Sequence, residues 1–149
     1  MSDLVDPFIL IPTISLVAQL FVLGLLIYGY LLKRRLDFQS HGRIMSTALV
    51  LHLILILAIM VPSFVFAIIP QYLLRNIFGT TSIVSLIHVP LGLIAVSLGL
   101  WLSVAWRFNG LRSCFSRKRF MLPTMTAWIA SLSFGIIFYV ILVISLLKG

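Results

Sequence analysis

The sequence has few charged residues. Only 9% of its 149 residues are charged, whereas 62% are hydrophobic and the mean hydropathy is +1.22. Soluble domains carry about 25% charged residues, because water must solvate their surface. The composition therefore excludes a soluble enzyme, a secreted disulfide-rich module, a disordered tail and a nucleic-acid-binding domain.

Acidic residues are scarcer still. The chain has three, Asp3, Asp6 and Asp37, and none of them lies within a long apolar run. Proton-coupled transporters, ion pumps and intramembrane hydrolases usually need a buried carboxylate. The sequence also has no HExxH, no paired Asp and no P-loop. We therefore expect neither ion or proton translocation nor an enzyme that acts alone.

Cysteine is nearly absent. The single one, Cys114, cannot form an internal disulfide. It lies among basic residues, and the sequence predicts a bystander rather than a redox centre. A reactive thiol activated by the neighbouring cations is the alternative.

Four long apolar runs account for most of the chain. Each can cross a hydrocarbon core about 30 Å thick as a helix. We expect spans over residues 8–32, 44–69, 82–106 and 121–147. Barrel strands are excluded, because they alternate apolar and polar residues. The sequence thus predicts an all-α integral membrane bundle in one domain, residues 1–149.

The net charge of +8 comes from basic residues that gather in two connections between the expected spans. Their members are Lys33, Arg34, Arg35 and Arg43 in the first, and Arg107, Arg112, Arg117, Lys118 and Arg119 in the second. Short basic loops stay in the cytoplasm and attract anionic lipid headgroups. We therefore expect a multi-pass protein of the cell membrane with both termini outside, and no nucleic-acid partner.

Small residues and prolines mark the expected helices. Gly92, Ala95 and Gly99 fall on one helical stripe, which predicts that the third span turns this side to the bundle interior. Three prolines would open the second, third and fourth helices locally: Pro62, Pro90 and Pro123.

The three histidines are the main candidates for chemistry. His41 and His52 are 11 residues apart, which puts them on one helix face about 16 Å from each other, too far to bind one metal. At about 1.5 Å per residue, His52 and His88 lie at levels that differ by about 9 Å. Facing imidazoles on neighbouring helices form b-type haem sites. Haem b, another metal, and hydrogen bonding to neighbouring helices all remain open.

Three short motifs stand out: His41-Gly42-Arg43-Ile44 at the start of an apolar helix, Leu86-Ile87-His88-Val89-Pro90-Leu91 in the next, and Arg117-Lys118-Arg119-Phe120 leading into Pro123 and Trp128. Over roughly residues 38–145 the chain resembles the small membrane family that contains CtaM and YozB. That family comprises helical proteins associated with maturation of haem-copper terminal oxidases.

The resemblance extends to two of the histidines. His41 and His88 match histidines of the family pattern, and His52 has no clear counterpart. Ser116 or Arg117 stands where the family has a third histidine, and a further one falls near Ser63.

The sequence leaves two functional classes in competition. The resemblance implies an assembly factor for a respiratory oxidase, with His41, His52 and His88 contacting haem or metal. The alternative is a non-catalytic accessory subunit of a larger membrane complex, in which the histidines are structural and the helix surfaces pack against other integral membrane subunits.

Overall fold

The computed structural model describes residues 7–148. Within this range it describes all side chains except those of residues 7–9, 109, 111–116 and 145–148. Cys114 lies outside the described side chains, and Asp3 and Asp6 lie outside the described residues.

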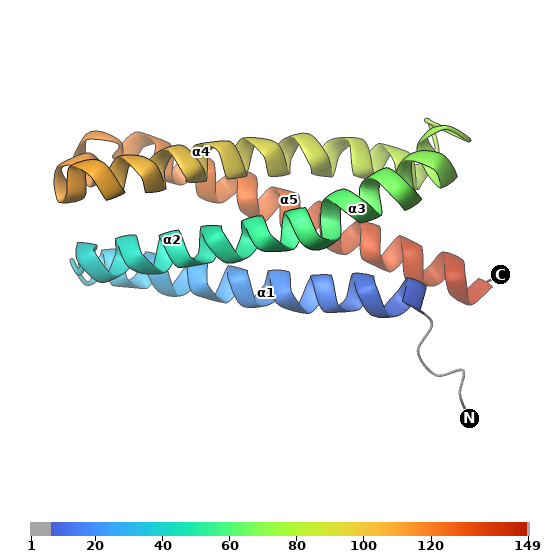
Figure 1. Ribbon diagram of the computed structural model, residues 1–149, viewed down its shortest axis with the longest axis horizontal. Helices are drawn as coiled ribbons and strands as arrows, with labels where there is room; N and C mark the ends of the chain where they lie inside the picture. Colours follow the sequence, from blue (N-terminus) through green and yellow to red (C-terminus); the bar gives the residue numbers. More distant parts are fainter. Residues whose placement is uncertain (1–6, 149) are drawn as a thin grey trace, which may run out of the picture.

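The described residues form an all-helical bundle, as predicted (Figure 1). In chain order the elements are α1 (Pro7–Arg34), α2 (Phe38–Leu55), η1 (Ile56–Met60), α3 (Val61–Ser63), η2 (Phe64–Leu73), α4 (Thr80–Ser116) and α5 (Lys118–Lys148). Four stretches are long and apolar enough to cross a membrane: Leu10–Arg34, Phe38–Leu73, Thr80–Phe108 and Lys118–Ile144. These stretches overlap the four predicted spans and confirm them.

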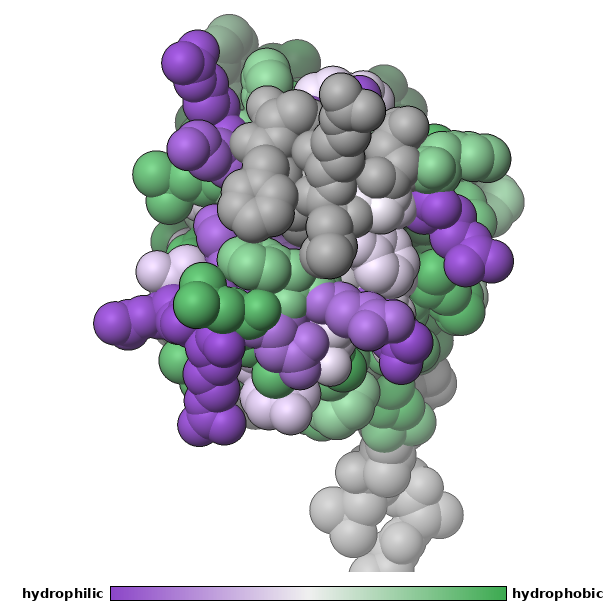
Figure 2. All heavy atoms as spheres, turned by 90° about the vertical axis from the view of Figure 1, so that its left-hand side faces the viewer, coloured by the Kyte–Doolittle hydropathy of each residue, from purple (hydrophilic) through white to green (hydrophobic). Residues whose placement is uncertain are grey.

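These four stretches form four long rods: α1, the continuous run from α2 to η2, α4, and α5. Successive rods run in opposite directions (Figure 1). The turn between α1 and α2 and the junction between α4 and α5 therefore lie at the same end of the bundle (Figure 1). We call this end the basic end, because Lys33, Arg34, Arg35 and Arg43 lie at its first connection and Arg117, Lys118 and Arg119 lie at its second. Hydrophilic side chains project from this end in Figure 2. The described chain begins and finishes at the opposite end.

A tight turn joins α1 to α2 at the basic end. Leu36 has a φ of 63°, and the amides of Asp37 and Leu36 donate to the carbonyls of Leu32 and Lys33, both at 3.1 Å. These two bonds form a Schellman motif, which satisfies the last carbonyls of a helix. Asp37 then caps α2 by accepting a 3.1 Å hydrogen bond from the Ser40 amide. Hydrogen bonding by the Ser40 side chain and amide lowers the pKa of the Asp37 carboxyl below 3.8.

This cap moves the beginning of the second helix. The predicted span begins at Ile44, but α2 begins at Phe38, six residues earlier. Hydropathy places the boundary at the edge of the apolar run, whereas the cap places it directly after Asp37. His41 lies on the helix, as expected, and Arg43, which was assigned to the first connection, lies on it too.

The second rod changes its helix type near its prolines. From Ile56 to Leu73 it is mostly π-helical, with hydrogen bonds such as that from the Leu74 amide to the Ile69 carbonyl, at 3.0 Å. Pro62 and Pro70 lie in this part, and neither has an amide hydrogen to donate. The predicted disturbance at Pro62 is confirmed. The rod starts against α1 and finishes against α4 (Figure 1).

The other two predicted openings are wrong. Helix α4 continues through Pro90, and α5 continues through Pro123. A proline removes a single backbone hydrogen bond, which a helix held by its neighbours tolerates in a membrane bundle. The break in α4 lies instead at Gly110, whose φ of 57° and ψ of −140° suit glycine.

The core lies where α4 approaches α5 and α2. Ala95 is fully buried, a Cβ on Gly92 would lie 3.2 Å from Ser131 Oγ, and one on Gly99 would lie 3.3 Å from Leu49. The predicted interior stripe of the third span is therefore confirmed. Its neighbours in the core come from α1, α2 and α5: Val22, Leu26, Ala48, Leu49 and Trp128.

Candidate functional site

His52 is buried on the inner face of α2. The residue is 5% exposed, and its ring centroid lies 4.7 Å from that of Trp128 on α5, with the two planes inclined by 43°. Its Nδ1 atom is buried and has no hydrogen-bond partner, and no other described buried side-chain nitrogen or oxygen is in this position. One polar atom in the interior is therefore unsatisfied.

His88 ties α4 to α5. Its Nδ1 lies 2.7 Å from the carbonyl oxygen of Ser131, and because a carbonyl only accepts, Nδ1 carries the proton. The Ser131 hydroxyl donates back to the His88 carbonyl at 3.3 Å. Gly135 makes room for the ring, since a Cβ there would lie 3.1 Å from Cε1. In the neutral imidazole, Nε2 is then the unprotonated nitrogen.

The fold brings two of the three predicted histidines together. His52 packs on Trp128 and His88 bonds to Ser131, three residues further along α5, so both imidazoles lie against the same stretch of α5. His41 lies three turns away from His52 along α2 and belongs to a different environment. Among the described residues, no three of the types His, Cys, Asp and Glu form a metal-binding group.

His41 ties α2 to α1 near the basic end. The residue is 5% exposed, and its Nδ1 donates to the carbonyl oxygen of Gly29 at 2.7 Å. As in His88, the neutral ring then has an unprotonated Nε2. Glycine at position 29 leaves room for Met45, because a Cβ there would lie 2.8 Å from Met45 Sδ.

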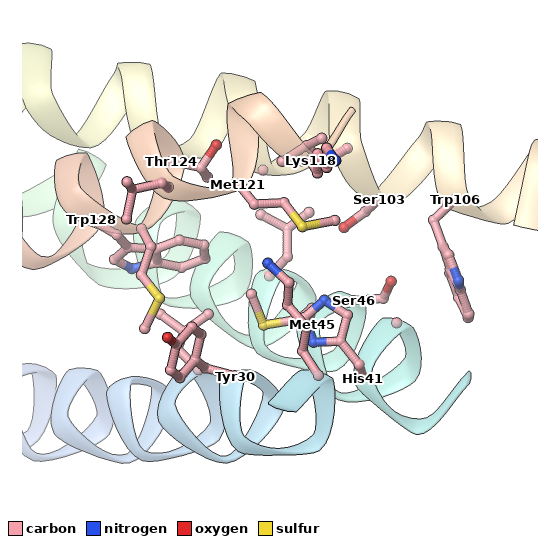
Figure 3. A pocket seen from close by; sticks show the side chains of 18 residues that line it. Tyr30, His41, Met45, Ser46, Ser103, Trp106, Lys118, Met121, Thr124 and Trp128 are labelled. Atoms are coloured by element: carbon pink, nitrogen blue, oxygen red, sulfur yellow. The ribbon is translucent and has the colours of Figure 1, made fainter. Parts of the chain in front are cut away.

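A cavity of about 140 Å³ lies beside His41, between α1, α2, α4 and α5. Its wall combines the imidazole with three thioethers, three aromatic rings and two lysines (Figure 3). The lysines are Lys33 and Lys118. Trp128 belongs to this wall and also contacts His52, so a single indole separates the cavity from the second histidine environment.

Trp106 closes the cavity on the side of the basic end. A Cβ on Gly42 would overlap its indole, so the ring lies directly on the α2 backbone. Aromatic contacts also order the nearby junction between α4 and α5: Trp101 meets Phe120 edge to face at 5.1 Å, and the Arg117 guanidinium lies 5.2 Å from the Trp101 ring.

The sequence does not predict the cavity. Lys33 and Lys118 were expected to set the membrane topology, and no role was expected for the methionines. One signal was present in the sequence, namely two pairs of side chains at i, i+4 spacing: His41 with Met45, and Met121 with Met125. Which helix faces meet is a tertiary property, and spacing within one helix does not provide it.

Comparisons with known proteins give no assignment: no family model, no curated protein and no solved structure matches the chain.

Proposed function

We propose that the protein is a membrane-embedded assembly factor for a haem-copper terminal oxidase, and that it handles haem through His52 and His88. The motifs that contain His41 and His88 support the class of function by resemblance. The observation that carries the site is the buried, unpartnered Nδ1 of His52, with a second imidazole packed against the same stretch of α5.

An unpartnered buried nitrogen is costly. Leaving a buried donor or acceptor unsatisfied costs about 1–3 kcal/mol, and such a group in a folded protein calls for an explanation, of which a redox role or a bound ion is one. His88 has the orientation that metal-bound imidazoles commonly have, with one ring nitrogen donating to a backbone carbonyl and the other available to a ligand. His52 and His88 therefore fit the donor pair of a b-type haem.

In this proposal the haem iron supplies the redox chemistry, and the chain holds and orients the group. His52 and His88 would ligate it, and the Ser131 carbonyl would fix the His88 ring. The His52 ring packs against Trp128 and is 5% exposed, so loading requires this indole to move. Because the site must open before haem can bind, it suits an assembly factor that holds haem temporarily and then transfers it. It suits a cytochrome that keeps its haem permanently less well.

A second function is favoured by a different observation. His41 and His88 each donate a hydrogen bond to a backbone carbonyl of another helix, at 2.7 Å in both cases. Such bonds strengthen helix association in lipid without any ligand. On this basis the protein is a non-catalytic accessory subunit of a larger membrane complex.

The test is a haem titration of the protein purified in mild detergent. We expect a reduced-minus-oxidised Soret change that His52→Ala and His88→Ala each abolish. Ser85→Ala is the matched control, because Ser85 is buried on α4 close to His88 and its hydroxyl donates within its own helix, to the Thr81 carbonyl. Wild-type protein without a Soret change, recovered stoichiometrically with a large complex, would support the accessory subunit instead.

We also propose that the basic end faces the cytoplasm of the cell membrane, because short basic connections remain on that side. An impermeant amine reagent should label Lys33 and Lys118 in permeabilised cells only. Labelling of these lysines in intact cells would reverse the orientation.

A further inference from the structure

We propose that the cavity at the basic end is a binding site for Cu(I), with His41 and the thioethers of Met45, Met121 and Met125 as ligands. It is separate from the His52–His88 site and does not depend on haem binding.

The four ligands come from two helices that face each other across the bundle. His41 and Met45 are one turn apart on α2, and Met121 and Met125 are one turn apart on α5. All four line the same cavity. The two helical pairs therefore place one imidazole and three thioether side chains in the wall of one cavity.

The imidazole is already oriented for ligation. Its Nδ1 donates to the Gly29 carbonyl, which leaves Nε2 as the free nitrogen of the neutral ring. Met45 Sδ packs on the Cα of the same Gly29. One residue of α1 thus holds the ring and the sulfur next to each other, as Figure 3 shows for His41 and Met45. Met121 extends over the cavity from α5 (Figure 3).

The composition of the wall selects the metal. No carboxylate and no thiolate occurs among the described residues that line the cavity, so hard cations such as Mg²⁺ and Ca²⁺ lack the oxygen ligands they need. Thioether sulfur is a soft ligand and favours Cu(I). The volume also suits a small occupant: about 140 Å³ is less than the roughly 300–1,000 Å³ of ordinary small-molecule pockets.

The two lysines in the wall limit the charge of the occupant. Lys33 and Lys118 repel any cation in the cavity, and they repel a divalent ion twice as strongly as a monovalent one. The competing occupant is an anionic lipid, with its headgroup on the lysines and a chain among the apolar side chains. Removal of a lysine should strengthen the binding of Cu(I) and weaken the binding of an anionic lipid. Only the binding of Cu(I) should depend on the methionine sulfur atoms.

The experiment is an anaerobic Cu(I) titration of the full-length protein in detergent, against a chromogenic Cu(I) chelator. Met45→Leu, Met121→Leu and Met125→Leu keep an apolar side chain of similar size but remove the sulfur, so each should weaken binding at least about tenfold. Met60→Leu is the control, because Met60 accepts a hydrogen bond from Gln19 at 3.6 Å and does not line the cavity. X-ray absorption of the Cu(I) complex should report sulfur and nitrogen scatterers.

Lys33→Leu provides the opposing measurement because it removes the charge without adding a sulfur, and it should strengthen Cu(I) binding. The proposal is overturned if the three methionine variants bind Cu(I) like Met60→Leu, or if Lys33→Leu weakens binding. Anionic lipid that co-purifies with wild type and the methionine variants, but not with Lys33→Leu, would identify the lipid as the occupant. His52→Ala should leave Cu(I) affinity unchanged, so failure of this site and failure of the haem site are distinguishable.

Discussion

The two histidines of α2 lie on one helix face and are equally buried, yet their surroundings are opposite. His41 donates to the Gly29 carbonyl and faces a cavity, whereas His52 has an unpartnered Nδ1 and packs on Trp128. The difference lies in the opposing helix. His41 meets a backbone carbonyl of α1, whereas the ring of His52 meets an indole of α5. Burial alone therefore does not tell whether an interior imidazole is structural or available to a ligand.

The largest effect that we expect is a loss of stability next to His41, where the Trp106 indole packs directly on Gly42. Gly42→Ala introduces a methyl group that overlaps the ring, and overpacking of this kind costs about 1–3 kcal/mol. Thermal unfolding in detergent should show a clear loss of stability. The matched control is Gly24→Ala, because no atom lies within 4 Å of a Cβ at that position. Equal melting temperatures for the two variants would contradict the close contact between the Trp106 indole and Gly42.

The next prediction compares the stability contributions of His88, whose Nδ1 is hydrogen-bonded, and His52, whose Nδ1 has no partner, in protein without haem. His88→Leu removes the hydrogen bond to Ser131 and should cost about 1 kcal/mol. His52→Leu removes an unsatisfied nitrogen and should leave stability unchanged or raise it by up to about 1 kcal/mol. His88→Leu should therefore melt below wild type, and His52→Leu should melt at or above it. A larger loss in His52→Leu would mean that His52 Nδ1 has a partner in the folded protein.

The smallest effect concerns the cap that begins α2. The pKa of Asp37 is lower in the folded protein than in the unfolded chain, so its contribution is present above the unfolded pKa of about 3.9 and is lost as the pH falls through the folded pKa. Thermal unfolding between pH 6 and pH 3 should show a small decline below about pH 4. Asp37→Asn retains a capping side chain without the titration, and it should remove this part of the decline. A decline of the same size in Asp37→Asn would assign it to another group.

Much of the fold is predictable because hydropathy acts over long stretches. The four spans and the interior stripe of Gly92, Ala95 and Gly99 follow from composition and periodicity. The second span was predicted to begin at Ile44, six residues after the observed beginning of α2 at Phe38, because the carboxylate of Asp37 caps the helix and hydropathy does not register a cap. Proline gave an ambiguous signal: the helix type changes around Pro62, while α4 continues through Pro90. The support of neighbouring helices decides between these outcomes, and a linear pattern does not contain it.

The sites were less predictable than the fold. The histidines were identifiable as rare polar groups in apolar runs, but nothing in the sequence distinguishes the unpartnered nitrogen of His52 from the tied nitrogens of His41 and His88. The thioethers were counted as ordinary apolar residues. Their convergence depends on the rotation of α2 and α5 about their own axes, which side-chain packing across the bundle determines.

The tight turn at Leu36 and Asp37 has a consequence for both histidine environments. With so few residues between α1 and α2, the length of the turn sets the angular register of one helix against the other. One residue inserted into the first turn of α2, between Asp37 and His41, would rotate the rest of α2 relative to this turn by about 100°. Such an insertion would turn His41 away from Gly29 and His52 away from Trp128 together, without altering a side chain at either place.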